Sequence, residues 1–97
     1  MTNIYVLPDQ PSFPLGDLYV TASVDRELDQ TDIWKALERH GQRDWGDVCE
    51  EDRYENDMSL TNGTRLLSVY HDRNGVKFWV ITEADRSATT VLLPDDY

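Results

Sequence analysis

The chain has 97 residues, which is enough for one domain, spanning residues 1–97, and too few for a second hydrophobic core. Nineteen acidic residues oppose nine basic ones, and the resulting net charge of −10 repels nucleic acid and anionic membranes. Aromatic residues make up 10% of the chain and argue against disorder. The composition therefore predicts one acidic globular domain that attracts basic surfaces and does not bind nucleic acid directly.

The sequence offers little to a metal, a disulfide or a membrane. Its single cysteine, Cys49, has no partner for either a disulfide or a paired-thiol metal site. The apolar runs are a few residues long, far below the roughly 20 residues of a membrane-spanning helix. The apolar start is interrupted by Pro8 and Asp9 and does not resemble a signal peptide. We expect a cytoplasmic protein with no metal, no cofactor and no membrane partner.

The N-terminal part predicts an extended lead-in followed by a strand. Three prolines make residues 1–15 an extended segment, within which the apolar residues 4–7 are an expected edge strand. Residues 18–22 are rich in β-forming side chains and predict the first strand of the domain.

Two helices are predicted in the middle of the chain. Residues 31–40 carry apolar side chains at helical spacing, with Asp29 or Thr31 as the cap. A turn with an aromatic anchor follows, and residues 48–60 predict the second helix. Tyr54 and Met58, one turn apart, are expected on its core side.

The C-terminal third predicts a β-hairpin. Residues 64–71 and 76–83 are two β-rich runs, and Asn74 followed by Gly75 is typical of a two-residue type I′ turn between strands. That turn places Tyr70 opposite Trp79. Large apolar side chains on both faces indicate that the hairpin is central to its sheet.

A further strand over residues 88–93 ends at Pro94. Together the elements predict an α+β fold, with a three- to four-stranded antiparallel sheet and two helices packed on one face.

Acidic residues are concentrated between positions 44 and 57, where seven carboxylates and one arginine leave a net charge of −6. The seven are Asp44, Asp47, Glu50, Glu51, Asp52, Glu55 and Asp57. On a continuous helix, Asp47, Glu51 and Glu55 form a stripe about 12 Å long, at about 1.5 Å per residue. Such a stripe imitates a short piece of phosphate backbone. The alternative interpretation is an ordinary solvated helix face.

Residues 82–87 combine two carboxylates, a guanidinium and a hydroxyl, as an active site does. A nucleophile also needs a base within reach, and neither histidine has a partner that the sequence identifies. The segment therefore predicts a turn closed by its own hydrogen bonds, or a recognition surface. We include Glu83, Asp85 and Arg86 with the seven acids as candidate partner-binding residues.

Recognised catalytic motifs are absent from the sequence. It contains no phosphate-binding glycine loop, dinucleotide fingerprint, zinc-protease motif or paired cysteines, and its basic residues are dispersed. We therefore predict a binding protein and not an enzyme.

Three segments resemble the signatures of a family of short bacterial proteins. They are residues 43–47, residues 55–57 and the tail at 78–97. Members of that family occur on plasmids, phages and integrated elements, and are often labelled plasmid-related proteins or type I restriction subunits. At 97 residues the chain is too short for a methyltransferase or a specificity subunit. The resemblance implies a mobile-element origin in a bacterial host, and it implies no catalytic residues.

Context and charge together predict a function. Mobile elements benefit from small proteins that disable host defence nucleases, and these nucleases hold DNA or guide RNA in basic channels. We expect an anti-CRISPR or anti-restriction inhibitor that acts as a DNA mimic on the basic nucleic-acid-binding surface of a host defence protein complex. An antitoxin-like or regulatory protein-binding partner, without DNA mimicry, is the alternative.

Overall fold

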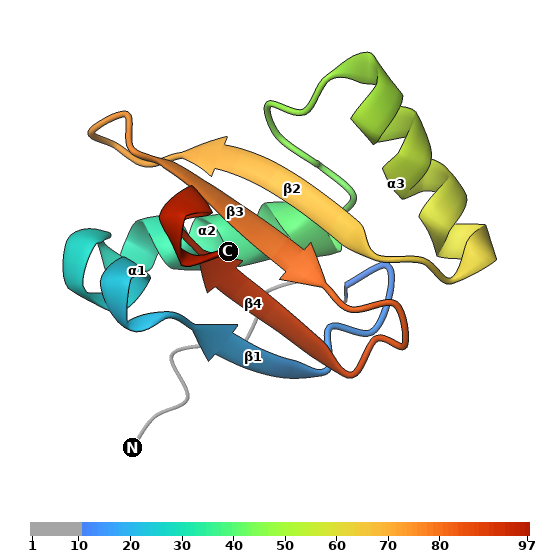
Figure 1. Ribbon diagram of the computed structural model, residues 1–97, viewed down its shortest axis with the longest axis horizontal. Coiled ribbons are helices and arrows are strands. Elements are labelled where there is room, and N and C mark those ends of the chain that lie inside the picture. Colours follow the sequence, from blue (N-terminus) through green and yellow to red (C-terminus); the bar gives the residue numbers. More distant parts are fainter. Residues whose placement is uncertain (1–10) are drawn as a thin grey trace.

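The computed structural model describes residues 11–97, which form an α+β fold with one four-stranded sheet and three α-helices (Figure 1). The elements in chain order are β1 (Asp17–Val20), α1 (Ala22–Glu27), α2 (Gln30–Gly41), α3 (Glu50–Asn62), β2 (Leu66–His71), β3 (Lys77–Thr82), β4 (Ala88–Leu92) and the 3-10 turn η1 (Pro94–Asp96). The predicted α+β class is confirmed. The strand expected at residues 4–7 lies outside the described residues.

The sheet is mixed, in the order β1-β4-β3-β2, so the prediction of a purely antiparallel sheet is wrong. The β2–β3 and β3–β4 pairs are antiparallel, whereas β1 runs parallel to β4, with Asp17 opposite Ala88 and Val20 opposite Val91. A parallel pair needs a long connection between its strands, and here α1, α2, α3, β2 and β3 supply it. Strand direction has no local sequence signal, which is why the composition of residues 18–22 did not reveal it.

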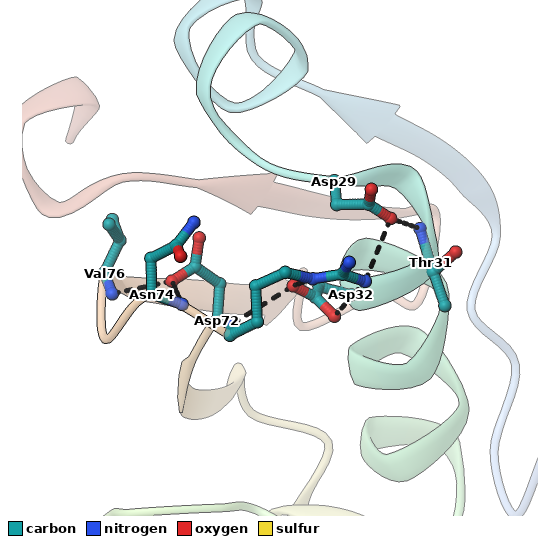
Figure 2. Close-up of polar contacts among 7 residues, drawn as sticks. Asp29, Thr31, Asp32, Asp72, Asn74 and Val76 are labelled. Atoms are coloured by element: carbon teal, nitrogen blue, oxygen red, sulfur yellow. Dashed lines mark hydrogen bonds and ion pairs between the residues drawn. The ribbon is translucent and has the colours of Figure 1, made fainter.

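The hairpin between β2 and β3 turns through three residues and not two. Gly75 has a positive φ of 84°, but Asn74 does not, whereas a type I′ turn needs positive φ at both positions. Asp72 closes the loop, because its backbone N–H donates to the carbonyl of Val76 at 2.9 Å and its carbonyl accepts from the Gly75 N–H at 2.9 Å. Its carboxylate also accepts from the backbone N–H groups of Asn74 and Val76, at 2.9 and 2.7 Å (Figure 2).

The extra loop residue moves the hairpin register by one. Tyr70 lies opposite Phe78, and Val69 lies opposite Trp79, so the predicted pairing of Tyr70 with Trp79 is wrong. Tyr70 and Phe78 are both buried on the same side of the sheet. The prediction that the hairpin is central to its sheet is correct for β3, the strand of Trp79, which has β4 on one side and β2 on the other, but wrong for β2, which is an edge strand.

Arg73 links the hairpin tip to the start of α2 by ion pairs. Its Nε and Nη2 donate to the two carboxylate oxygens of Asp32 at 2.9 and 3.2 Å, and Nη2 lies 3.2 Å from Asp29. The hydrogen bonds from Arg73 lower the pKa of Asp32. Asp29 is the N-cap of α2, as predicted, and accepts from the Thr31 N–H at 2.8 Å.

The main hydrophobic core lies between one face of the sheet and α1 and α2. It contains Val24, Leu28, Ile33, Ala36, Leu37, Tyr70, Phe78, Val80 and Val91. A second, smaller cluster contains Phe13, Leu15, Trp45 and Leu66. Helix α3 takes a different place, along the outer side of β2 and at the opposite edge of the sheet from β1 (Figure 1).

A buried chain of polar side chains connects α2 to the sheet. His40 Nδ1 lies 2.6 Å from the Ser68 hydroxyl and Nε2 lies 2.9 Å from the Thr82 hydroxyl. Thr82 contacts Thr89 at 2.7 Å, and the Thr89 hydroxyl donates to the carbonyl of Leu15 at 2.7 Å. Burial, followed by the charge of a nearby arginine, lowers the pKa of His40 to about 3. The imidazole is therefore neutral and structural.

Candidate functional site

Helix α3 is attached to β2 by polar contacts. The Asn56 side-chain amide donates to the carbonyl of Leu67 at 2.7 Å and accepts from its N–H at 3.0 Å. One side chain thus satisfies both backbone groups that Leu67 presents at the edge of the sheet. Asn56 and Ser59 are the buried residues of α3, and Leu60 is half-buried. These three residues define the inner side of the helix.

The turn that precedes α3 covers the next part of the same edge. The Val69 N–H donates to the carbonyl of Trp45 at 3.0 Å, and its carbonyl accepts from the Asp47 N–H at 2.8 Å. Trp45 is 2% exposed, and its indole N–H donates to Asp57 at 3.0 Å. The predicted aromatic anchor is therefore confirmed, and the Asp57 carboxylate is its hydrogen-bond partner.

Two of the predicted acids, Asp44 and Asp47, lie before α3, which begins at Glu50. The predicted stripe of Asp47, Glu51 and Glu55 on one helix is therefore wrong, because the backbone of Asp47 pairs with β2. The Asp47 carboxylate lies 2.8 Å from Nδ1 of His71. Asp44 accepts from Arg39 at 2.7 and 3.2 Å, and these hydrogen bonds lower its pKa.

The remaining acids of α3 face solvent. Glu50 lies 3.6 Å from Arg53, one turn away. The carboxylates of Glu51, Asp52 and Glu55 are exposed and have no hydrogen-bond or ion-pair partner within residues 11–97. The first-turn acids favour the helix N-terminus electrostatically, but Glu51 and Glu55 repel each other at i, i+4 spacing. Repulsion of this kind stabilises nothing in the isolated protein.

Tyr54 and Met58 lie on the outer side of α3, so their predicted core orientation is wrong. They are 63% and 38% exposed. At about 100° per residue they project away from Asn56 and Ser59, which occupy the inner side. Apolar periodicity alone misled the prediction, because α3 uses polar side chains to contact the sheet.

Arg86, in the turn between β3 and β4, is engaged within the fold. It has a positive φ of 61°, and its guanidinium donates to four backbone carbonyls. Nη1 donates to Thr64 at 2.7 Å and to Glu83 and Ala84 at 3.2 and 3.3 Å, while Nη2 donates to Ser59 at 2.8 Å. The side chain therefore holds its own turn against the C-terminal end of α3.

The acids beside Arg86 have different roles. Asp85 accepts from the Ser87 N–H at 3.0 Å, and hydrogen bonds from Ser87 lower its pKa. Glu83 is exposed. The predicted turn closed by its own hydrogen bonds is thus present. It touches the C-terminal end of α3, whereas Glu51 and Asp52 lie at the opposite end of that helix.

We expect Arg86→Lys to lower the free energy of unfolding by about 2 kcal/mol, since an ammonium cannot reach the same set of carbonyls and charged hydrogen bonds are lost. Urea denaturation measures this loss. Arg53→Lys, on the exposed side of α3, is the matched control and should cost less than about 0.5 kcal/mol. Equal losses in the two variants contradict the structural role of Arg86.

Within residues 11–97, no three His, Cys, Asp or Glu side chains gather as metal ligands do. No helix in that part of the chain is long and apolar enough to cross a membrane. Comparisons with protein-family models, curated proteins and solved structures found no match to this chain.

Proposed function

We propose that the protein is an acidic inhibitor, carried by a mobile element, that binds the basic nucleic-acid-binding surface of a bacterial defence complex. The observation that carries this proposal is the outer face of α3. There Glu51 and Glu55 are exposed, and Asp52 is exposed at the N-terminal end of the helix, one turn before Asn56; none of the three carboxylates has a partner within residues 11–97. A basic partner relieves their mutual repulsion, which the fold itself leaves in place. The inhibitor is of the anti-CRISPR or anti-restriction class.

Charge complementarity accounts for how such a surface recognises its target. A net charge of −10 steers the protein toward basic channels and away from nucleic acid. Without Asp47, the helical line of acids is reduced to Glu51 and Glu55, about 6 Å apart along the axis at about 1.5 Å per residue. The proposed DNA mimicry therefore involves a shorter piece of backbone than the sequence predicted.

The proposed role involves no catalysis. His40 and Ser68 are hydrogen-bonded as a base and a nucleophile are, but both side chains are fully buried and out of reach of a substrate. His71, the other histidine, lies beside Asp47 at the surface. These placements support a binding protein.

The experiment compares two triple variants in DNA-cleavage assays with a guide-RNA-loaded CRISPR nuclease and a type I restriction complex. Glu51→Gln, Asp52→Asn and Glu55→Gln together should weaken inhibition about tenfold or more, mainly through slower association. The matched control removes three exposed acids near β1 and α1, with Asp17→Asn, Asp25→Asn and Glu27→Gln, and should retain most of the inhibition.

Salt and nucleic acid provide independent measurements. Wild-type inhibition should weaken steeply as salt rises, since the screening length falls from about 10 Å at 0.1 M to about 3 Å at 1 M. DNA should compete with the protein for the defence complex. Equal potency of the two triple variants, or absence of inhibition of both nucleases, contradicts the proposed function.

A second candidate, an antitoxin-like or regulatory role without DNA mimicry, is favoured by one specific observation. Tyr54 and Met58 are exposed on the same face as the acids, and a phosphate backbone presents no comparable apolar group. In that case DNA does not compete with the protein for its partner.

A further inference from the structure

Tyr54 and Met58 occupy the centre of the outer face of α3. They are one turn apart and 63% and 38% exposed, on the side of the helix directed away from Asn56 and Ser59. On a helix, residues three and four positions apart are neighbours on the surface. The two side chains therefore form one continuous apolar pair, although the rest of the exposed helix is polar.

Carboxylates border this pair on its N-terminal side. Glu50 and Glu51 lie one turn before Tyr54. Glu55 lies one turn before Met58. An apolar centre with a charged rim is the arrangement of a protein-binding surface, in which aromatic residues and methionine are enriched at the core.

The pair is not needed to hold α3 in place. The Asn56 amide and the packing of Ser59 and Leu60 attach the helix to the sheet from its other side. Tyrosine supplies a large apolar contact area, and methionine adapts its shape to irregular pockets. Such side chains contribute disproportionately to binding when a partner encloses them.

We propose that Tyr54 and Met58 are the apolar anchor by which α3 inserts into a hydrophobic pocket, rimmed by lysine or arginine, on a partner protein. The inference rests on the proposed inhibitor function, and not on DNA mimicry, and names the kind of surface that the inhibitor recognises. The negative charge of this surface favours a basic partner protein over the other molecules that could cover the apolar pair. Nucleic acid and anionic lipid carry the same sign as the acids beside the pair, and so does a second copy with its net charge of −10.

The anchor and the rim have separate roles in binding. The carboxylates accelerate association and lose their effect at high salt. The apolar pair slows dissociation, and its contribution persists at high salt because burial of apolar surface does not depend on ionic screening. An amphipathic helix that lies in a groove presents anchors at this i, i+4 spacing.

The test uses two defined basic probes and the isotope-labelled full chain. One probe is a helical peptide of leucine and lysine, which offers an apolar stripe with a basic rim, and the other is poly-lysine. Chemical-shift changes from the peptide should centre on α3. Tyr54→Ser with Met58→Ser should weaken peptide binding about tenfold at high salt and leave poly-lysine binding unchanged. The matched control, Tyr19→Ser with Val76→Ser, removes two exposed apolar side chains elsewhere and should bind as the wild type does.

Each outcome distinguishes the anchor from the inhibitor function. Peptide binding that is unaffected by Tyr54→Ser with Met58→Ser, or shifts centred away from α3, overturns the anchor. Loss of nuclease inhibition in the Glu51, Asp52 and Glu55 variant overturns the anchor but supports the inhibitor if the Tyr54 and Met58 variant inhibits as well as the wild type does at high salt. An anchor-dependent peptide complex without nuclease inhibition supports the anchor and overturns the inhibitor. Circular dichroism should show an unchanged fold, because both side chains are exposed.

Discussion

Replacing Gly46 with alanine is expected to lower the free energy of unfolding by more than about 4 kcal/mol, a large share of the roughly 5–15 kcal/mol of a typical domain. Gly46 has a φ of 76°, which L-residues rarely adopt. A Cβ atom there would lie 2.0 Å from the carbonyl oxygen of Val69 and 2.7 Å from the Tyr70 ring. The turn would have to move away from β2, and the hydrogen bonds that join Trp45 and Asp47 to Val69 would break.

Gly63 provides the matched control. It has a similar φ of 72°, but nothing lies within 4 Å of the position that its Cβ would take. Gly63→Ala should therefore cost only the conformational strain, about 1–2 kcal/mol. Urea denaturation of the two variants distinguishes the free-energy cost of backbone strain from the cost of steric overlap between the added Cβ and β2. Similar losses at both positions contradict the packing of the Gly46 turn against β2.

The parts of the fold that have strong local signals were predictable. Helix α2 has a capping aspartate, Asp29, and buried side chains at helical spacing in Ile33, Leu37 and His40. Asn74 and Gly75 correctly indicated a hairpin. The number of loop residues was not predictable from these two alone, because Asp72 closes a three-residue loop with its own side chain. A one-residue difference in the loop was enough to move the whole register.

The orientation of α3 illustrates why features that depend on contacts between distant residues could not be predicted from the sequence. Tyr54 and Met58 suggested an inward apolar face, yet the inner side carries Asn56 and Ser59. The Asn56 side chain hydrogen-bonds the backbone of Leu67, which lies eleven positions later at the edge of the sheet. No spacing rule in the sequence connects a helix amide to a strand that follows it. The buried asparagine becomes understandable only once the edge of β2 is seen beside α3.

The candidate binding residues divide into two groups. Six of the ten named from the sequence have partners within the fold, and these are Asp44, Asp47, Glu50, Asp57, Asp85 and Arg86. The carboxylates of Glu51, Asp52, Glu55 and Glu83 are exposed and have no partner within residues 11–97.

The pH dependence of stability should be dominated by His40 near neutrality. An unfolded histidine has a pKa of about 6.5. In the fold, burial and then the positive charge of Arg86 lower the pKa of His40 to about 3. The unfolded chain therefore binds the proton first, so the contribution of neutral His40 is complete above pH 6.5 and is lost progressively as the pH falls toward 3.

The interval between pH 6.5 and 5 isolates this effect, because carboxylates with pKa values of 4 or below are still ionised there. We expect the free energy of unfolding to fall by about 2 kcal/mol across it, at up to about 1.4 kcal/mol per pH unit. Urea denaturation at several pH values measures the slope. His40→Gln, although less stable at pH 7, should lose that slope, whereas His71→Asn at the surface should keep it. A wild-type stability that stays constant over the interval contradicts a neutral buried His40, as does the appearance of a charged imidazole in the folded protein by NMR at pH 5.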